Sequence, residues 1–441
     1  MHVIQTVLTK INDVLWGWPM LFLLCGTHLF LTVRLKGIQR FVFKGIAMSF
    51  SRSRKGDGEI SHFGALTTAL AATVGTGNIA GVASAIAAGG PGAVLWMWLT
   101  GVFGIATKYG EAVLSVKYRR VGKDGTVSGG PMFVLEHGLK SKTLGILFAV
   151  FTVIAAFGIG NTVQSNSIAH LMSESLSVSR TVTGAILTLL TALVVLGGIK
   201  SIARVCGMMV PFMAVLYIGG CITLLILFAD NIIPSLVLIG KNAFTGHAAI
   251  GGFIGAGVRS AIRYGIARGL FSNESGMGSA PIVAAAAKTD HPVAQALVSA
   301  TGTFWDTVVI CALTGIVIVA SGEWQDGATG VALTKQVFAH LTGAGPIVLT
   351  LALFFFVFST IIGWSYYGEK AAEYLFGKKV IVFYRAFWVI AVFIGAKVNV
   401  PVVWSFADAA NAFMAIPNLI SLIALSGIIV NETKTFLIRE Q

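Results

Sequence analysis

The chain has 441 residues, of which 56% are hydrophobic and 11% are charged, and its mean hydropathy is +0.84. This composition excludes a soluble globular domain and indicates an integral membrane protein. The formal net charge of +13 would suit a nucleic-acid partner, but the basic residues gather in alternate connections between apolar segments, as the positive-inside rule describes. We therefore predict no nucleic-acid partner and a multi-pass protein of the cell inner membrane, with its N-terminus outside and its C-terminus in the cytoplasm.

About 20 apolar residues cross a bilayer as a helix, so the apolar segments predict an all-α fold with about eleven transmembrane helices. The predicted helices cover residues 13–34, 62–88, 92–117, 144–172, 181–199, 207–229, 253–287, 296–320, 345–371, 380–398 and 402–430. The four cysteines lie within these segments without a CxxC pair, which indicates neither a zinc site nor a disulfide framework.

Two of the predicted helices are interrupted by glycine and small polar residues near their middle. The second contains "TVGTGNIAG" and the seventh contains "GLFSNESGMGSAP". Because they lie five helices apart, they open two groups of five, residues 62–229 and 253–430, that must be inserted in opposite directions. Segment 13–34 is then an extra N-terminal helix. Interrupted helices at matching positions of two inverted halves indicate the central binding site of a transporter.

A break in a transmembrane helix predicts a cavity, because backbone N–H and C=O groups need protein or water partners at membrane depth. The half-helix that ends at a break presents carbonyl oxygens to a cation, and the half-helix that begins there presents N–H groups to a carboxylate. One break could therefore bind both charged groups of an amino acid. The alternative for a single glycine-rich segment is close helix packing through small residues.

Several longer motifs resemble the alanine or glycine:cation symporter family, and the resemblance covers essentially the whole chain. The motifs are "TALAATVGTGNIAGVA" (68–83), "GGPGAVLWMWLTGVFGIATKYGEAVLSVKYR" (89–119), "FGIGNTVQSNS" (157–167), "RGLFSNESGMGSAPIVAAAAKTDHPVAQALVS" (268–299) and "GWSYYGEK" (363–370). The resemblance implies the leucine-transporter fold, with ten core helices in two inverted repeats and one extra N-terminal helix. It also implies uptake of alanine or glycine coupled to Na⁺ or, less often, to H⁺. Ser275 departs from the family motif, which usually has alanine at this place.

The candidate substrate ligands come from both breaks, from the fourth helix and from the ninth. They are Thr73, Gly75, Thr76, Gly77, Asn78, Gln164, Phe271, Asn273, Gly276, Met277 and Trp364. The alternatives are structural: threonines inside helices often bond to their own backbone carbonyls, Gln164 could bond to another helix, and Trp364 could be an ordinary core residue.

The candidate Na⁺ ligands are oxygen donors without formal charge, which suit this hard cation. They are Thr73, Thr76, Asn78, Ser359 and Thr360. The resemblance implies the last two residues in particular, because the corresponding helix of the leucine-transporter class supplies adjacent hydroxyls to a Na⁺ beside the first broken helix. Na⁺ is expected as the co-transported ion, and no other cofactor is predicted.

Charged residues inside predicted helices are costly and usually have partners. We expect Glu274 to form an ion pair with Arg268, with a proton-transfer or gating role as the alternative. Lys108 and Glu111 are three residues apart on one helical face and are expected to pair with each other. Asp306 is a candidate proton site if coupling uses H⁺.

These observations predict a symporter that imports a small neutral amino acid, alanine or glycine, with Na⁺ by alternating access. Coupling to H⁺ is the alternative, and a passive channel is a third possibility that lacks the expected filter loops or rings of charge. An enzyme is not expected, because we find neither an HExxH motif nor a nucleophile beside a base.

Overall fold

The structure is a computed structural model that describes residues 2–51, 56–245, 257–343, 345–398 and 401–439. These residues are almost entirely helical, which confirms the predicted all-α class. The described part of the chain contains one small sheet, an antiparallel pair of strands β1 (Arg120–Val121) and β2 (Val127–Ser128).

The N-terminal region forms two helices where the sequence predicts one over residues 13–34. Helix α1 (His2–Leu15) ends before Gly17, and α2 (Trp18–Arg34) begins there with Pro19 in its first turn. Proline suits this place because the first N–H groups of a helix have no partner inside it. Two short helices follow, η1 (Ile38–Phe41) and α3 (Val42–Ser49).

The first predicted group of helices contains both regular α-helices and short π-helical segments (η2, η3 and η4). Its members are α4 (His62–Thr73), η2 (Gly77–Gly81), α5 (Val82–Gly89), α6 (Ala93–Lys117), α7 (Pro131–Phe133), η3 (Val134–Gly138), α8 (Lys142–Phe157), η4 (Gly158–Thr162), α9 (Val163–Leu176), α10 (Arg180–Val195) and α11 (Gly198–Leu227). Helix α12 (Ala229–Thr245) follows this group and lies between the two predicted groups.

The second predicted group begins at residue 253, which lies outside the described residues. Its members are α13 (Val258–Asn273), α14 (Pro281–Ala284), α15 (Pro292–Thr303), η5 (Phe304–Cys311), α16 (Ala312–Ser321), η6 (Glu323–Asp326), α17 (Gly330–Ala339), α18 (Gly345–Phe376), α19 (Val380–Lys397), α20 (Pro401–Ala424) and α21 (Ser426–Arg439). The last predicted helix, 402–430, is thus divided between α20 and α21.

Seven described helices are long and apolar enough to cross a membrane, and the bent pair of α4 with η2 and α5 makes an eighth span. Of the predicted helices, the remaining three correspond to α6, α10, and α13 with α14. Helix α10 has only 16 residues, and α6 contains the charged Lys108 and Glu111. The chain is therefore a polytopic helical membrane protein.

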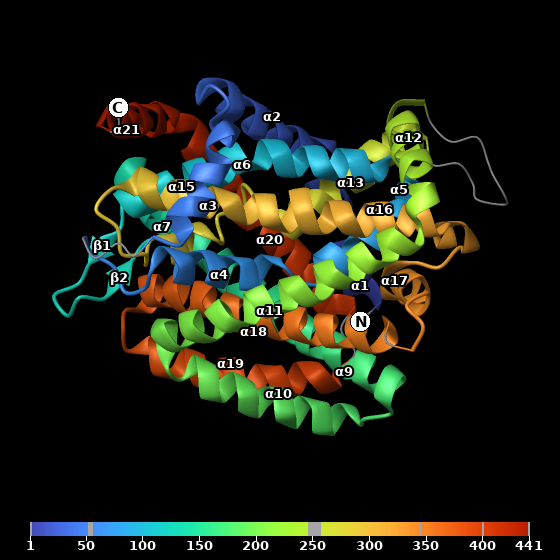
Figure 1. The fold of residues 1–441 in the computed structure, drawn as a ribbon. Helices are drawn as coiled ribbons and strands as arrows, with labels where there is room; N and C mark the ends of the chain where they lie inside the picture. The colour runs from blue at the N-terminus through green and yellow to red at the C-terminus, as the bar shows by residue number, and fades with distance from the viewer. Residues whose placement is uncertain (1, 52–55, 246–256, 344, 399–400, 440–441) are drawn as a thin grey trace.

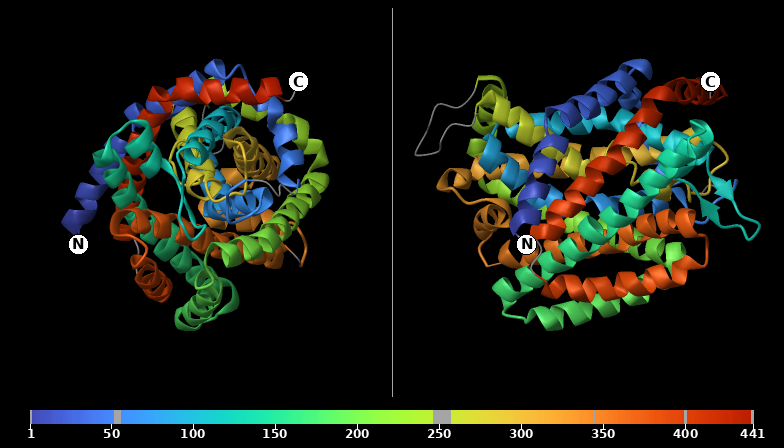
Figure 2. Two further views of the ribbon diagram at one scale, coloured as in Figure 1. Left: turned by 90° about the vertical axis from the view of Figure 1, so that its left-hand side faces the viewer. Right: turned by 180° about the vertical axis from the view of Figure 1, so that it is seen from behind.

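The long helices run side by side, as Figure 1 shows, with the β1–β2 hairpin and the C-terminus at one end and α12 and α17 at the other. Figure 2 shows α10 and α19 as a pair beside the main bundle. Large apolar side chains on this pair are exposed, among them Leu193 on α10 and Val382 on α19. Such surfaces are suited to contact with lipid.

Serine residues begin several of the helices that build the interior. The hydroxyl of Ser61 accepts a hydrogen bond from the N–H of Gly64 at the start of α4, at 3.0 Å. Ser141 and Ser179 cap α8 and α10 in the same way. Each cap satisfies one of the N–H groups that a helix leaves free in its first turn. Helix α4 is buried along almost its whole length, so its broken end lies inside the protein.

Candidate functional site

The predicted interruption of the second helix is present between α4 and η2. Helix α4 ends at Thr73, Val74 has an extended backbone (φ −75°, ψ 95°), and the chain bends by 53°. Asn78 closes the break: its Oδ1 accepts a hydrogen bond from the N–H of Gly75 at 2.9 Å. Its Nδ2 donates to Asp306 Oδ1 at 2.7 Å. The first break is therefore short, and a neutral amide holds it.

The predicted interruption of the seventh helix is longer and more strongly distorted. Helix α13 ends at Asn273, and Glu274, Gly276 and Gly278 all have positive φ angles, of 52°, 94° and 83°. A Cβ atom on Gly278 would lie 2.8 Å from the Phe148 ring, so this position combines a left-handed backbone with close packing. Glycine is thus required by the geometry of this break.

A buried carboxylate satisfies the backbone of the second break. Glu111 Oε1 accepts hydrogen bonds from the N–H groups of Gly276 and Gly278, at 3.1 and 2.9 Å. It also accepts from Asn418 Nδ2 at 2.7 Å. Backbone groups that would be costly to leave unpaired at membrane depth therefore have a side-chain acceptor.

The two breaks pack directly against each other. A Cβ atom on Gly77 of the first break would lie 3.3 Å from the Cα atom of Ser272, next to the second break. Asp306 connects them further, because it accepts hydrogen bonds from Asn78 Nδ2 at 2.7 Å and from Ser272 Oγ at 2.9 Å. Segments almost 200 residues apart in the sequence thus form one polar centre.

A small cavity of about 20 Å³ lies between the breaks and the helices around them. Seven of the predicted substrate ligands line it: Thr73, Gly75, Thr76, Gly77, Gln164, Phe271 and Trp364. Thr360, a predicted Na⁺ ligand, lines it as well, together with Glu274 and Asn411. The structure therefore gathers residues from η2, α9, α13, α18 and α20 around one space.

Two residues that line this cavity have buried acceptor oxygens without partners among the described residues. Gln164 donates from Nε2 to the carbonyl of Ile159 at 2.9 Å, which leaves its Oε1 without a hydrogen bond among the described residues. The Oδ1 of Asn411 is likewise without a partner there, and its Nδ2 donates to Met277 Sδ at 3.3 Å. Buried acceptors of this kind are suited to an ammonium group or a metal cation.

The predicted cation ligands of α18 lie beside the first broken helix. Ser359 Oγ is 3.0 Å from the carbonyl oxygen of Ala71, to which it donates. Gly75 packs against Thr360 so closely that a Cβ atom on the glycine would lie 2.9 Å from Thr360 Oγ1. Two hydroxyls and a helix-end carbonyl therefore bring neutral oxygens together, as a Na⁺ site requires.

Comparison with known proteins identifies the family. A profile of the sodium:alanine symporter family matches residues 1–441. The chain belongs to this family. It is 50% identical to the sodium/alanine symporter AgcS of Methanococcus maripaludis, over 98% of this chain and 97% of the relative. It is 35% identical to a putative sodium/proton-dependent alanine carrier protein, YrbD of Bacillus subtilis, over 95% and 89% of the two chains.

The fold is also similar to that of a solved structure, MhsT in complex with L-phenylalanine. The TM-score is 0.60 at 18% sequence identity, and the match covers 85% of this chain and 90% of that one. The leucine-transporter type of fold that the sequence motifs imply is thereby confirmed for this family member.

Four predicted substrate ligands do not line the small cavity. Asn78 Oδ1 accepts a hydrogen bond from the N–H of Gly75 within the first break. Asn273 Oδ1 accepts one from the N–H of Ser275 at 2.9 Å. Gly276 bonds to Glu111, and Met277 contacts Asn411. These residues bond to other groups of the protein and do not line the small cavity, and their proposed role as ligands stays a prediction. Thr73 Oγ1 donates to the carbonyl of Ala69 at 3.2 Å, the structural alternative for this residue.

Both expected ion pairs are wrong. Glu274 accepts instead from Trp364 Nε1 at 3.2 Å and from the hydroxyl of Ser279. Arg268 lies over the ring of Phe271. Lys108 and Glu111 share a helical face, but their charged groups lie beyond ion-pair distance, and Lys108 Nζ has no hydrogen-bonding partner among the described residues. Both expectations came from the spacing of charged residues along one segment. Such spacing carries no information about partners that another helix supplies, such as Trp364 for Glu274.

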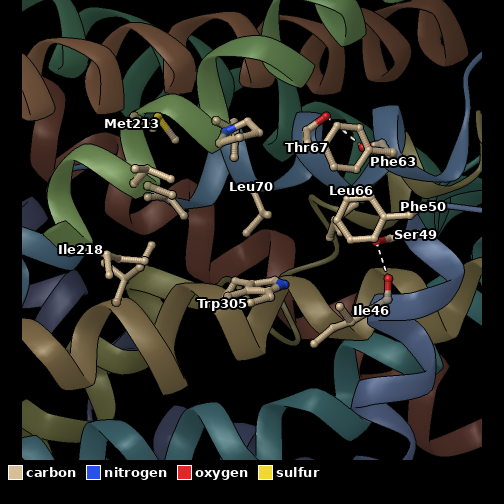
Figure 3. Close-up of a pocket in the computed structure, with 16 residues that line it drawn as sticks. Ile46, Ser49, Phe50, Phe63, Leu66, Thr67, Leu70, Met213, Ile218 and Trp305 are labelled. Atoms are coloured by element: carbon tan, nitrogen blue, oxygen red, sulfur yellow. Dashed lines mark hydrogen bonds between the residues drawn. The ribbon is translucent and has the colours of Figure 1, made fainter.

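A larger cavity of about 270 Å³ has a different character. Figure 3 shows Leu66 and Leu70 of α4, Ile218 of α11 and Trp305 of η5 around it. Its hydroxyl groups are already used, because Ser49 and Thr67 donate to the carbonyls of their own helices. This apolar space offers no group for the charged ends of an amino acid, so the small cavity is the candidate site of this family member.

Proposed function

We propose that the chain is a symporter that imports alanine or glycine together with Na⁺ by alternating access. The observation that carries this proposal is the small cavity, where the first break, Gln164 and Thr360 meet. The N–H groups at the start of η2 are suited to the substrate carboxylate. The free oxygens of Gln164 and Asn411, with the Glu274 carboxylate, are suited to its ammonium group.

The walls of the cavity support a substrate with a very small side chain. Trp364 is completely buried, and a Cβ atom on Gly160 would lie 2.3 Å from the Cβ atom of Trp364. Phe271 and Ile159 occupy other sides. A methyl group or a hydrogen atom fits such a space more readily than a branched or aromatic side chain.

The proposed Na⁺ site consists of Ser359, Thr360 and the carbonyl end of α4. Ala71 and Ala72 contribute to the close contact between α4 and α18, because Gly363 packs on the backbone of Ala72. An ion there would touch both the broken helix and the helix across the cavity, so its binding would favour one relative position of the two.

We further propose that residues 62–229 and 253–430 form two inverted repeats, with the N-terminus outside and the C-terminus in the cytoplasm. The end of the bundle that holds the C-terminus also holds the basic residues around the β1–β2 hairpin, such as Arg120 and Lys123. The positive-inside rule favours the cytoplasm for this end.

Coupling to H⁺ is the second candidate, because Asp306 and Glu274 are buried carboxylates beside the cavity. Asp306 is bonded to both broken helices, so a proton on it would weaken a contact between them. This arrangement would give H⁺ a route of coupling that does not use Thr360.

The deciding experiment is uptake of labelled alanine into proteoliposomes. We expect an inward Na⁺ gradient to drive accumulation, with an equal K⁺ gradient as the control. Accumulation driven by an inward H⁺ gradient without Na⁺ would favour the second candidate. Uptake that responds to neither gradient would contradict symport.

The orientation of the chain has a separate test. A reporter fused to the C-terminus should be accessible only from the cytoplasmic side.

A further inference from the structure

Lys108 is a buried lysine that neither the fold nor the proposed transport cycle explains. It lies in α6, its residue is 4% exposed, and its Nζ has no hydrogen-bonding partner among the described residues. A buried ammonium group is costly unless a counter-charge or acceptor contacts it. An acceptor is therefore missing at this place.

A second donor without a partner lies with Lys108 at another cavity, distinct from the candidate substrate cavity. Lys108 and Asn273 both line it, together with Thr73 and Ser299. Asn273 Oδ1 accepts from the N–H of Ser275, which fixes the amide orientation, and Nδ2 is left without a partner among the described residues. Ser299 Oγ accepts from Gln295 Nε2 at 3.0 Å, so its own proton remains for donation.

The neighbouring carboxylates do not supply the missing acceptor. Glu111, on the same helix, uses Oε1 for two backbone N–H groups and for Asn418. Glu274 is held by Trp364 and Ser279. Asp306 is held by Asn78, Ser272 and Thr307. Glu111 Oε2 has no partner among the described residues, but it lies beyond contact distance of the Lys108 ammonium group, which has no acceptor there either. The oxygens of Glu274 and Asp306 accept from donors of their own.

We propose that this cavity binds a single halide ion, chloride under physiological conditions, between Lys108 Nζ, Asn273 Nδ2 and the Ser299 hydroxyl. The free space of about 10 Å³ for the centre of a water-sized sphere corresponds to one small particle. An amino acid is too large for it. A water molecule would fit but would bring no negative charge to the ammonium group.

The position of the cavity gives the anion a role in transport. Thr73 lines both this cavity and the candidate substrate cavity. The positive charge of Lys108, in a cavity that shares Thr73 with the substrate cavity, opposes cation binding there, and an anion in contact with Lys108 would reduce that opposition. This role rests on the proposed function, whereas anion binding itself does not.

The test measures thermal unfolding of the purified protein in detergent at constant Na⁺ concentration and ionic strength, with chloride progressively replacing gluconate. We expect a saturable rise of Tm with chloride in the natural protein, because a ligand that binds only the folded state stabilises it. Lys108→Met and Asn273→Asp, which remove the charge and the amide donor respectively, should lose this rise. Lys117→Met removes a lysine of the same helix that pairs with Glu432 at its surface, and should keep it.

A Tm that is equal in chloride and gluconate for the natural protein, or a chloride response that persists in Lys108→Met, would overturn the proposal. If the variants do not fold, crystals of the natural protein grown in bromide decide the question. An anomalous peak between Lys108 and Asn273 would support the site, and its absence would refute it. Failure of Na⁺-driven alanine uptake in both anions would instead count against the proposed function alone.

Discussion

The two helix breaks differ in how their backbones are held. The first is short, has no positive φ angle from Val74 to Asn78, and is held by the neutral amide of Asn78. The second contains positive φ angles at Glu274, Gly276 and Gly278, and a buried carboxylate binds its N–H groups.

This difference separates ligand binding from structural support. Gly75, Thr76 and Gly77 of the first break line the candidate cavity, whereas Gly276 and Gly278 of the second bond to Glu111 behind it. We infer that the first break supplies the backbone contacts to the substrate, and that the second mainly gives Phe271 and Glu274 a fixed position. Changes at the two breaks should therefore have different consequences.

The largest effect is expected for Glu111→Ala. The N–H groups of Gly276 and Gly278 would lose their acceptor, and the amide of Asn418 would keep only the carbonyl of Gly276. Each unsatisfied buried donor costs about 1–3 kcal/mol. We expect a loss of folded protein or a large fall in Tm, measured by thermal unfolding in detergent. Asp326→Ala at an exposed acidic position is the control. An unchanged Tm for Glu111→Ala would show that the second break does not need this support.

A smaller and more specific effect is expected for Thr360→Ala. Removing one hydroxyl from the proposed Na⁺ site, next to Gly75, should raise the Na⁺ concentration for half-maximal alanine uptake about tenfold, which corresponds to about 1.4 kcal/mol. The Tm in the absence of Na⁺ should stay close to that of the natural protein. Thr360→Ser keeps the hydroxyl and should retain Na⁺ affinity. Equal Na⁺ dependence in both variants would place the ion elsewhere.

A change confined to substrate affinity is expected for Gln164→Leu. The leucine removes the free Oε1 from the cavity without creating a large void, so alanine affinity should fall by about fivefold to tenfold, about 1 kcal/mol. Because Gln164 is not one of the proposed cation ligands, Na⁺ binding without alanine should not change. Equilibrium binding of labelled alanine would measure the effect. Unaltered affinity would remove Gln164 from the site.

The sequence allowed the two interrupted helices to be predicted because their cause is local. Clustered glycine and small polar residues weaken a helix, and their matching positions in the two halves favour breaks at "TVGTGNIAG" and "GLFSNESGMGSAP" without knowledge of the neighbours. The candidate ligands on these two segments could be proposed for the same reason, whereas Gln164 on "FGIGNTVQSNS" is a candidate by analogy with the binding region of the family. The leucine-transporter fold was predicted from the resemblance of longer motifs to a family, because hydrophobic periodicity alone does not distinguish one transporter fold from another.

Partners between distant helices could not be predicted in this way. Glu111 binds Asn418, 307 residues further along the chain, instead of Lys108 three residues before it. Asn411, which lines the cavity, was missed, although an amide in an apolar helix is itself a signal of a polar contact at membrane depth. The division of residues 402–430 into α20 and α21 was missed because both parts contain apolar residues.

The smallest effect on Tm is expected when a carboxylate at the surface is replaced. Asp124 is such a carboxylate, whereas Glu111 is buried. Asp124, between β1 and β2, accepts from Lys378 Nζ at 2.6 Å and from Thr126 Oγ1 at 2.7 Å. The hydrogen bond from Lys378 is the main cause that holds the pKa of Asp124 well below its ordinary value of 3.8. A lowered pKa in the folded state stabilises the protein above the unfolded-state pKa, and this stabilisation is lost as pH falls below it.

Asp124→Asn should therefore lower Tm slightly at pH 7 and by the same amount at pH 5, and the difference from the natural protein should shrink below pH 4. High salt should reduce the difference at every pH, because both charged groups are exposed to solvent. Thermal unfolding at several pH values and two salt concentrations would measure both trends. A difference as large as that of Glu111→Ala would mean that the hairpin, and not the second break, determines the stability of the fold.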